Sequence, residues 1–553
     1  MDQRSKRYFI IVLALLSIWS FSVLIAVSTL PSESSPSFRV EAIPFHGENS
    51  FSYPHPEPNS YCDDWKLSSQ KTVWVDRRNA YSATKIESFG WDMLQSKKSG
   101  NALQFASISK PEYHNTRWAK IFLQSDQENN EALFLIPKNA NFIFTRMYHY
   151  KNALSDNIQT ARLGVDYACP GQILNHIPGA SAFCRKDFLQ RYLLDYNKRL
   201  QKEGLSHCFR GYLTPKSYIL GEPDHCNAFI DELEAQLNNY NSSNMPIEWI
   251  TKSSLRHKGY GIELIDYKRA QYYYNLYRKN EEEDLNCNRV LDAHKSLIAQ
   301  KYISNPALIE GRKFDFRVFA MVINSDPLVA LWAPENGHTR LSDQEFDKLS
   351  TNFTTHITAN VANQNPDSVD FLKKYRFNLR EIANYYKDQL KDHEKWLTDV
   401  AFPQVKQILI HMLRATQQNF LIKRIGFLEF YGIDFILDDT LQNIYLLESN
   451  RRPDVQEKNP DLQYREDMLL QDFSAVAEYF LKTGVSSINT EEIYKKLKAF
   501  KPLVDETRFD PYFGLLSEEC RVTFKEFNED LPIDPMIEPL KYYVGNFNAK
   551  AKV

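Results

Sequence analysis

Charged residues interrupt an apolar run at every second position in the second half of the chain, and this pattern restricts how that part can fold. In the segment RKFDFRVFAMV, Lys313, Asp315 and Arg317 alternate with apolar residues. Because successive side chains of a β-strand point to opposite faces, the three charges share one face of a strand. Burying them costs free energy unless they pair with one another or bind a charged ligand. The pattern therefore predicts either an ion-pair network on an edge strand or a site for a charged ligand.

A second pattern predicts a metal site on a hairpin. The segment GIDFILDDTLQNIYLLESN reads as two strands joined by a turn at residues 438–443. Asp434 lies on the first strand, and Glu448 and Asn450 lie two positions apart on the second, so all three can face one side. Carboxylate and amide oxygens suit Mg²⁺, which binds them together with nucleotide phosphate oxygens. Asp434 also lies within an apolar run, where a buried carboxylate needs a cation.

A third pattern is a lysine at the end of an expected strand, followed by a glycine-containing loop. Lys252 follows Trp249, Ile250 and Thr251, and Gly259 and Gly261 come shortly after it. Lysine supplies a compact positive charge, and glycines let backbone N–H groups approach phosphate oxygens. The spacing matches neither the Walker loop nor the dinucleotide fingerprint, and alone it also describes an ordinary solvated turn. The three patterns in this order predict one nucleotide–magnesium site.

The rest of the chain reads as several mixed lobes. Short apolar runs such as ALFLI, FIFTR and IYLLES alternate with longer amphipathic stretches such as DFLQRYLLDYNKRLQ, which predicts α/β lobes. At about 100 to 200 residues per domain, 553 residues correspond to three or four lobes. No internal repeat indicates a solenoid or a propeller.

Charge and cysteine usage narrow the function classes. The chain has 67 Lys and Arg against 70 Asp and Glu, a net charge of −3, which excludes a generally basic protein that coats nucleic acid phosphates. The seven cysteines contain no C-x-x-C pair, so their spacing indicates no zinc or redox motif. An odd number slightly favours a reducing compartment, although three bridges beside one free thiol would also give seven.

The N-terminal segment predicts a membrane anchor. Residues 8–30 carry no charge and follow Arg4, Lys6 and Arg7, and a stretch of this length can span a bilayer. A long cleaved signal peptide is the alternative. The three cations before the span place the N-terminus in the cytoplasm and the remainder across the membrane.

Residues 31–60 contain six prolines and read as a tether. Asn241 and Asn352 begin glycosylation sequons, of which two are expected by chance in a chain this long.

The ordered motifs resemble the tubulin–tyrosine ligase and tubulin–tyrosine ligase-like family of the ATP-grasp superfamily. The resemblance runs from about Pro170 to Asp454 and includes GQILNHIPGASAFCRKDFLQRYL and TPKSYIL. It implies an α/β ATP-grasp fold preceded by a small α/β lobe. The N-terminal transmembrane helix is expected from the uncharged stretch at 8–30 and not from the resemblance. We expect the following division: a cytoplasmic stub and anchor at 1–30, a tether at 31–60, an uncharacterised segment at 61–140, a pre-ATP-grasp lobe at 141–210, a central lobe at 211–303, a C-terminal lobe with the magnesium site at 304–480, and an extension at 481–553.

The resemblance also implies a role for each site residue. These expectations are Lys252 on the α- and β-phosphates; Lys186 on the nucleotide or the acceptor; Gly259 and Gly261 in the phosphate loop; Gln300, Lys301 and Ile303 around adenine, with Lys301 and Ile303 acting largely through backbone groups; Lys313, Asp315 and Arg317 on ribose, phosphate and the acceptor carboxylate; Arg340 on the γ-phosphate or acyl phosphate; Thr358 as a retained nucleotide-binding residue; and Asp434, Glu448 and Asn450 on Mg²⁺. The chain departs from the family at Ala359, which replaces the usual asparagine. Arg451 and Arg452 are expected either to recognise an acidic acceptor or to lie in solvent.

The activity implied is ATP-dependent ligation of an amino acid, tyrosine or glutamate, to a protein acceptor, with the tubulin C-terminal tail as the favoured acceptor. The reaction passes through an acyl phosphate and needs no protein nucleophile, so His257 and His338 are interpreted as loop residues. Two alternatives stay open: a membrane-tethered module that binds nucleotide without turnover, and a lumenal ligase with a non-tubulin acceptor. The partners implied are the acceptor, a free amino acid and a membrane through residues 8–30. The side of that membrane is open, because the activity favours the cytoplasm and the charge rule favours the lumen.

Overall fold

The structure is a computed structural model that describes four short stretches before residue 145 and most of residues 172–521. The described residues are 72–75, 88–89, 92–93, 141–144 and 172–521, with gaps at 178, 209–213, 243, 255, 257–258, 280–284, 359–371, 421–424, 452, 454–459 and 485–487. The expected anchor at 8–30 and tether at 31–60 lie outside them. Among the described helices, none combines the length and the apolar character that a membrane crossing requires.

The largest sheet is antiparallel, with the order β13-β12-β10-β11-β14 and with β9 beside β10. Its strands are β9 Leu308–Ile309, β10 Arg312–Ser325, β11 Leu328–Leu341, β12 Glu429–Leu437, β13 Ile444–Arg451 and β14 Lys501–Asp505. The alternation along β10 explains why the sheet has a core on both faces. Phe316 and Val318 belong to one buried cluster, whereas Phe319 and Met321 belong to another.

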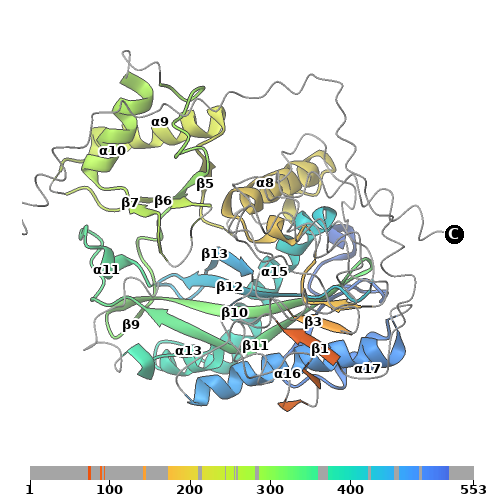
Figure 1. The fold of residues 1–553 in the computed structure, drawn as a ribbon. Helices are drawn as coiled ribbons and strands as arrows, with labels where there is room; N and C mark the ends of the chain where they lie inside the picture. The colour runs from red at the N-terminus through yellow and green to blue at the C-terminus, as the bar shows by residue number, and fades with distance from the viewer. Residues whose placement is uncertain are drawn as a thin grey trace, which may run out of the picture. The chain divides into compact units, whose positions relative to one another are not determined.

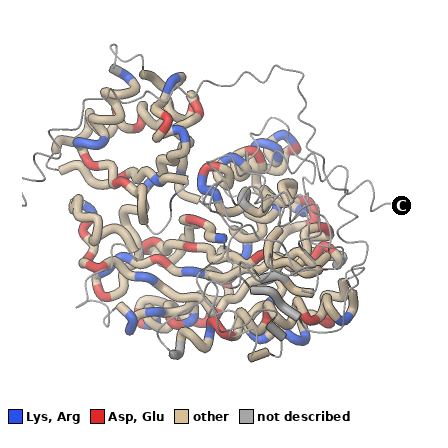
Figure 2. Tube along the Cα trace, in the orientation of Figure 1, with Lys and Arg blue, Asp and Glu red and all other residues tan. Residues whose placement is uncertain are grey.

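Helices cover both faces of this sheet (Figure 1). Helix α16, Pro460–Thr483, supplies Leu469 and Phe473 to the cluster that contains Phe319. Helices α8, Lys186–Lys202, and α15, Phe402–Thr416, contribute to the cluster that contains Phe316. Figure 2 shows basic and acidic positions interspersed along the described elements.

A smaller antiparallel sheet has the order β5-β8-β6-β7, with β5 Ser217–Ile219, β6 Trp249–Ser253, β7 Ile262–Leu264 and β8 Leu297–Lys301. Helices α9, Pro223–Asn239, and α10, Tyr267–Tyr274, share one buried cluster with its strands. Trp249 is central to that cluster, because its ring lies 5.5 Å from Tyr218 and 5.6 Å from Phe229. Proline at the first position of α9 suits a helix start, where its missing N–H needs no partner.

A third sheet is parallel and joins strands far apart in sequence, in the order β2-β1-β3-β4. Its strands are β1 Thr72–Val75, β2 Asp92–Met93, β3 Phe142–Phe144 and β4 Ile173–Leu174. Leu174 exchanges backbone hydrogen bonds of 2.8 Å with Gly426 and Leu428, just before β12. Strand β4 of this sheet is therefore hydrogen-bonded to the segment that leads into β12 of the largest sheet.

The remaining described elements are short. They are α11 Phe353–His356, α13 Leu379–Tyr385, α14 His393–Trp396 and α17 Thr490–Tyr494; the 3₁₀ turns η2 Ala180–Phe183, η3 Ser206–Cys208, η7 Gln417–Asn419 and η8 Glu518–Arg521; and the π-helical turns η5 Asn275–Lys279 and η6 Leu397–Ala401. An asparagine caps the N-terminus of α11, α13 and α17, where its side-chain oxygen accepts a backbone N–H.

The mixed α/β class is confirmed, and some details differ from the sequence predictions. Strand β8 ends at Lys301, so Ile303 follows it. His338 is a buried residue of β11, and its interpretation as a loop residue was wrong. Part of the expected extension after residue 480 joins the largest sheet, because β14 pairs with β11 and supplies its buried edge.

Candidate functional site

The centre of the candidate site is a pair of arginines held by two buried aspartates. Arg317 and Asp434 are opposite each other on β10 and β12, and Asp315 and Arg340 are opposite each other on β10 and β11. Nε and Nη2 of Arg340 donate to Asp315 at 2.7 and 2.9 Å, and its Nη2 also donates to Asp434 at 2.8 Å. Burial disfavours the charged form of Arg340, but the carboxylates of Asp315 and Asp434 outweigh burial and raise its pKa. Asp315 and Arg317 of β10 thus belong to an ion-pair network, but β10 is an inner strand of the sheet rather than the edge strand that one of the two predictions expected.

The three expected metal ligands lie together at the edge of this network. Nδ2 of Asn450 donates to Asp434 Oδ2 at 3.0 Å and to Glu448 Oε1 at 3.1 Å. The second oxygen of Glu448 lies 3.3 Å from Lys186 Nζ, at the start of α8. Burial acts to raise the pKa of Glu448, but the charges of Lys186, Lys252 and Arg340 outweigh it, and the pKa is lowered. Glu448 is therefore an ionised carboxylate.

The smaller sheet contributes Lys252, which is buried on β6. Its Nζ donates to Gln300 Oε1 of β8 at 2.6 Å, and Gln300 Nε2 donates to Ser217 Oγ of β5 at 3.2 Å. Burial is the main reason that the pKa of Lys252 is lowered to about 8, while Glu448, Asp315 and Asp434 act in the opposite direction. A lysine with a neutral amide as its hydrogen-bond acceptor is poised to bind an anion.

A directional chain of hydrogen bonds holds Lys313. Its Nζ donates to Tyr302 Oη at 2.9 Å, and Tyr302 Oη lies 2.8 Å from His356 Nδ1. His356 Nε2 lies 2.6 Å from the carbonyl of Ser350, which only accepts, so Nε2 carries the proton and Nδ1 accepts from Tyr302. Burial lowers the pKa of His356 to about 4, which agrees with a neutral ring.

The pKa of Lys313 itself is lowered to about 7, first by burial and then by the positive charge of Lys252, although Asp315 opposes this. The hydroxyl of Thr358 donates to Asp315 Oδ2 and so joins the same network. Thr358 is buried and follows α11 by two residues. The neighbouring Ala359 lies outside the described residues.

The glycine loop lies between β6 and β7. Gly259 and Gly261 have φ angles of 83° and 71°, which residues with a Cβ rarely adopt. A Cβ on Gly261 would lie 3.0 Å from Ser253 Cβ and 3.1 Å from Arg256 Cδ. The carbonyl of Arg256 accepts a hydrogen bond of 3.2 Å from Lys186 Nζ, so the loop and α8 meet at the same lysine.

Three expected residues do not place their side chains in this cluster. Lys301 Nζ pairs with Glu248 at 2.6 Å and lies over the Trp249 ring, and Ile303 is half-buried after β8. Arg451 is not turned toward an acceptor, because its Nε donates to the buried Glu429 at 3.0 Å. Arg452 lies outside the described residues.

Sequence reasoning missed two members of the site, Tyr302 and His356. Tyr302 stands between two residues expected at the adenine, and His356 stands two residues before Thr358. Both were visible as neighbours of expected residues, but their contact with Lys313 spans separate segments and has no local signature. The site contains five basic side chains and three carboxylates, which leaves two formal positive charges in excess. The basic residues are Lys186, Lys252, Lys313, Arg317 and Arg340, and the acidic residues are Asp315, Asp434 and Glu448.

Comparison with known proteins gives a consistent family match. The model of the "Tubulin-tyrosine ligase family" matches residues 166–478, more than half of the chain. The chain is 27% identical over 300 residues to "Probable alpha-tubulin polyglutamylase Ttll1" of Tetrahymena thermophila, which covers 51% of this chain and 66% of that protein. It is 33% identical over 185 residues to "Tubulin glycylase 3C" of the same organism, covering 32% and 17%. It is 26% identical over 321 residues to "Tubulin polyglutamylase TTLL5" of Mus musculus, covering 55% and 21%. The chain thus spans less than two thirds of the length of each of these relatives.

Proposed function

The chain belongs to the tubulin-tyrosine ligase family, and on this premise we propose that it is an ATP-dependent ligase that joins an amino acid to a protein carboxylate through an amide bond. In this proposal the nucleotide binds in an ATP-grasp arrangement between the smaller and the largest sheet. The smaller sheet contributes Lys252, Gln300 and the glycine loop. The largest sheet contributes Lys313, Arg317 and Arg340.

The observation that carries the proposal is a set of cations around three carboxylates. Lys252 and Lys313 are buried, and Lys186, Arg317 and Arg340 are half-buried. The first step requires an acceptor carboxylate to approach the γ-phosphate of ATP, and two anions repel each other. Fixed positive groups offset that repulsion without having to reorganise during the reaction. Nε and Nη2 of Arg317 and Arg340 are held by aspartates, whereas their Nη1 groups have no partner among the described residues. Each guanidinium is therefore oriented on one side and free to donate on the other.

The proposed reaction has two bond-forming steps. A carboxylate oxygen of the acceptor attacks the γ-phosphorus, the bond to the β-phosphate oxygen breaks, and ADP leaves. The amine of the amino acid then attacks the acyl carbon, the bond to the phosphate oxygen breaks, and the amine loses a proton. Lys252 and Lys313 bind phosphate oxygens, and Arg317 and Arg340 orient the two anions. Exclusion of water by the two sheets protects the acyl phosphate from hydrolysis.

The residues present fit a bound Mg²⁺. Asp434 and Glu448 carry carboxylate oxygens, which suit a hard cation, and the lowered pKa of Glu448 keeps it ionised. Asn450 donates from Nδ2 to both carboxylates and carries an amide oxygen as a third possible ligand. A bound Mg²⁺ would supply positive charge that offsets the negative charge of the nucleotide phosphates. Asp434, Glu448 and Asn450 would hold the ion, and Lys186 would remain beside Glu448 as a further cation.

The acceptor and the added amino acid are the finer part of the proposal. The printed names of the relatives describe tubulin polyglutamylases and a tubulin glycylase. We take the tubulin C-terminal tail as the first acceptor to test, with glutamate or tyrosine as the free amino acid. The membrane span at 8–30 remains a prediction of the sequence.

The test is incorporation of labelled tyrosine, glutamate and glycine, each separately, into detyrosinated tubulin by the full chain with ATP and Mg²⁺. We expect one amino acid to be incorporated and ADP to be released in step. Glu448→Gln should abolish incorporation and leave the folded state intact, because it removes a ligand charge at the edge of the fold. Glu518→Gln, an exposed carboxylate on η8, is the matched control and should retain wild-type turnover.

The outcomes separate the possible readings. Wild-type turnover by Glu448→Gln would contradict the metal assignment. ATP binding without ADP release on any acceptor would favour a nucleotide-binding module over a ligase. ADP release without labelled tubulin, when a mixture of cell proteins is supplied, would direct the search to another acceptor.

A further inference from the structure

The cysteines of the described part of the chain are paired rather than scattered. Cys226 and Cys287 form one disulfide, Cys208 and Cys520 form another, and Cys184 belongs to neither. All four bridged cysteines are buried. Disulfides of this kind persist in secretory and extracellular compartments and are rare where glutathione and thioredoxin keep thiols reduced. The two disulfides therefore argue against the reducing compartment that the odd cysteine number slightly favoured.

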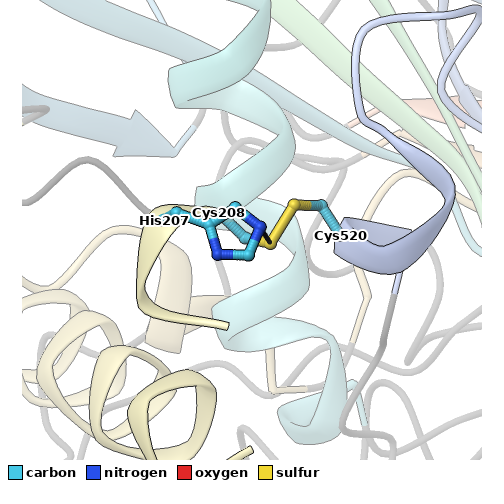
Figure 3. Close-up of side chains that lie close together, drawn as sticks. All are labelled: His207, Cys208 and Cys520. Atoms are coloured by element: carbon cyan, nitrogen blue, oxygen red, sulfur yellow. Dashed lines mark hydrogen bonds between the residues drawn. A yellow bond between two sulfur atoms is a disulfide. The ribbon is translucent and has the colours of Figure 1, made fainter. Parts of the chain in front are cut away.

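Each bridge joins segments that secondary structure alone does not connect. Cys226, in the first turn of α9, is linked to Cys287, 61 residues later, and their Cα atoms are 5.4 Å apart. Cys208 on η3 is linked to Cys520 on η8, 312 residues later, with Cα atoms 5.3 Å apart. Figure 3 shows His207 beside this second bridge. His207 Nε2 lies 3.1 Å from Glu519 Oε1, and the two sulfurs bond each other.

Independently, the two N-glycosylation sequons lie at the surface. Asn352 is exposed at the N-terminus of α11, and its Oδ1 accepts from the backbone N–H of Thr354 at 3.1 Å and from the Thr354 hydroxyl at 2.9 Å. The asparagine and the threonine of this sequon are thus in contact, and no described residue bonds the Asn352 Nδ2 atom. Asn241 is exposed in the turn that follows α9. Surface position is what attachment of a bulky glycan requires.

We propose that this chain matures in an oxidising secretory compartment and carries N-linked glycans on Asn241 and Asn352. In the attachment step, Nδ2 of asparagine bonds to the anomeric carbon of a lipid-diphosphate oligosaccharide; the carbon–oxygen bond to the diphosphate breaks, the lipid diphosphate leaves, and the amide loses one proton. Each disulfide forms when two thiols lose two electrons and two protons to a protein disulfide oxidant, which is reduced to a dithiol. The uncharged stretch at 8–30 after three cations is the sequence feature that would direct such export.

The proposal concerns where the chain matures and does not depend on ligase activity. It does change where an acceptor should be sought, because an acceptor must share the compartment of the folded ligase. Tubulin added to the purified protein would still be a valid chemical test. In the cell, however, acceptors would be carboxylates of secretory proteins.

The experiment expresses the full chain with its own N-terminus in eukaryotic cells, blocks free thiols at lysis, and compares the protein before and after amidase removal of N-glycans. We expect digestion to increase electrophoretic mobility. Mass spectrometry without reduction should find the Cys208 and Cys520 peptides joined, and likewise the Cys226 and Cys287 peptides. Thr354→Ala and Ser243→Ala should each remove one glycan, and the double variant should show no shift on digestion.

The matched controls are Thr354→Ser and Ser243→Thr, which keep each sequon and should keep each glycan. They separate loss of glycosylation from loss of folding. No shift on digestion together with four blocked thiols at Cys208, Cys226, Cys287 and Cys520 would overturn the proposal. A mobility shift that persists in the double variant would show that a glycan is attached elsewhere and would overturn the assignment of both asparagines. If only one of Asn241 and Asn352 carries a glycan, the assignment of the other asparagine is overturned. None of these results depends on whether the protein ligates amino acids.

Discussion

Arg317 and Asp434 lie directly opposite each other on β10 and β12, and the two nitrogen–oxygen contacts of their ion pair measure 2.7 and 2.9 Å. Asp434 is fully buried, where a carboxylate needs polar partners, and it accepts hydrogen bonds from both Arg317 and Arg340. Only the planar guanidinium group of arginine meets a carboxylate at two points in this way. The pair therefore fixes the Arg317 guanidinium beside Asp434, the residue proposed above as a Mg²⁺ ligand.

The first prediction follows from that geometry. Arg317→Lys keeps the charge but loses the two-point contact, so we expect kcat/KM for ATP-dependent ligation to fall about 100-fold or more, as on removal of one oriented donor. Because the charge is kept, unfolding temperature should change little. Coupled measurement of ADP release and thermal unfolding would check both. Wild-type kcat/KM in this variant would show that Arg317 acts only as a charge.

The second prediction concerns pH. The pKa of Lys313 is lowered to about 7, chiefly by burial, and bound phosphates would raise it because they favour the charged ammonium. Nucleotide binding should therefore take up a proton, and affinity should weaken as pH rises above about 7, by at most about tenfold per pH unit. Titration calorimetry with a non-hydrolysable ATP analogue, in buffers of different ionisation enthalpy, measures both effects.

Lys313→Arg is the control for this pH dependence, since arginine stays charged throughout the range. In that variant the affinity for the ATP analogue should no longer change with pH near pH 7. The affinity should still weaken above pH 8, because the pKa of Lys252 is lowered to about 8. An affinity for the analogue that does not change with pH in the wild type would mean that Lys313 does not face the phosphates.

The third prediction uses two glycines with similar backbones and different surroundings. Gly261 and Gly204 have φ angles of 71° and 75°, but a Cβ would crowd Ser253 and Arg256 only at Gly261, and at Gly204 it would meet nothing within 4 Å. Gly204→Ala should cost about 1 kcal/mol of stability and leave nucleotide affinity unchanged. Gly261→Ala should in addition weaken nucleotide binding several-fold, because the loop must move away from Lys186. Equal nucleotide affinities would exclude the loop from the binding site.

The fourth prediction concerns the buried Glu429. Burial raises its pKa, but Arg451 and His176 outweigh burial, so the pKa is lowered from 4.5 to about 2. A carboxylate with a lowered pKa stabilises the fold above its unfolded pKa, and this stabilisation is lost as pH falls from about 4.5 toward 2. Glu429→Gln should therefore lower the free energy of unfolding by roughly 3 to 5 kcal/mol at neutral pH, because it removes the buried carboxylate that Arg451 and His176 contact.

Denaturant titrations at several pH values would measure this difference. The difference in unfolding free energy between the wild type and Glu429→Gln should become smaller as pH falls below about 4.5. The unfolding free energy of Glu518→Gln should equal that of the wild type at every pH. A gap that stays constant down to the acid transition would mean that Glu429 is not ionised in the folded protein.

The sequence by itself determined the local parts of the candidate site. The period of two along β10 already placed Lys313, Asp315 and Arg317 on one face, and the same period placed Glu448 and Asn450 together. These predictions succeeded because strand geometry depends on neighbouring residues alone. The buried carboxylate in an apolar run likewise indicated that cations must lie near Asp434, as Arg317 and Arg340 do.

Only the tertiary structure decided which distant partners meet. Arg451 looked available for an acceptor until folding placed it against Glu429, 22 residues earlier, and Tyr302 and His356 reached Lys313 from two other segments. The pairing of Cys208 with Cys520 across 312 residues is of the same kind. Contacts between distant segments depend on how whole sheets and helices pack, and neither periodicity nor residue spacing encodes that packing locally.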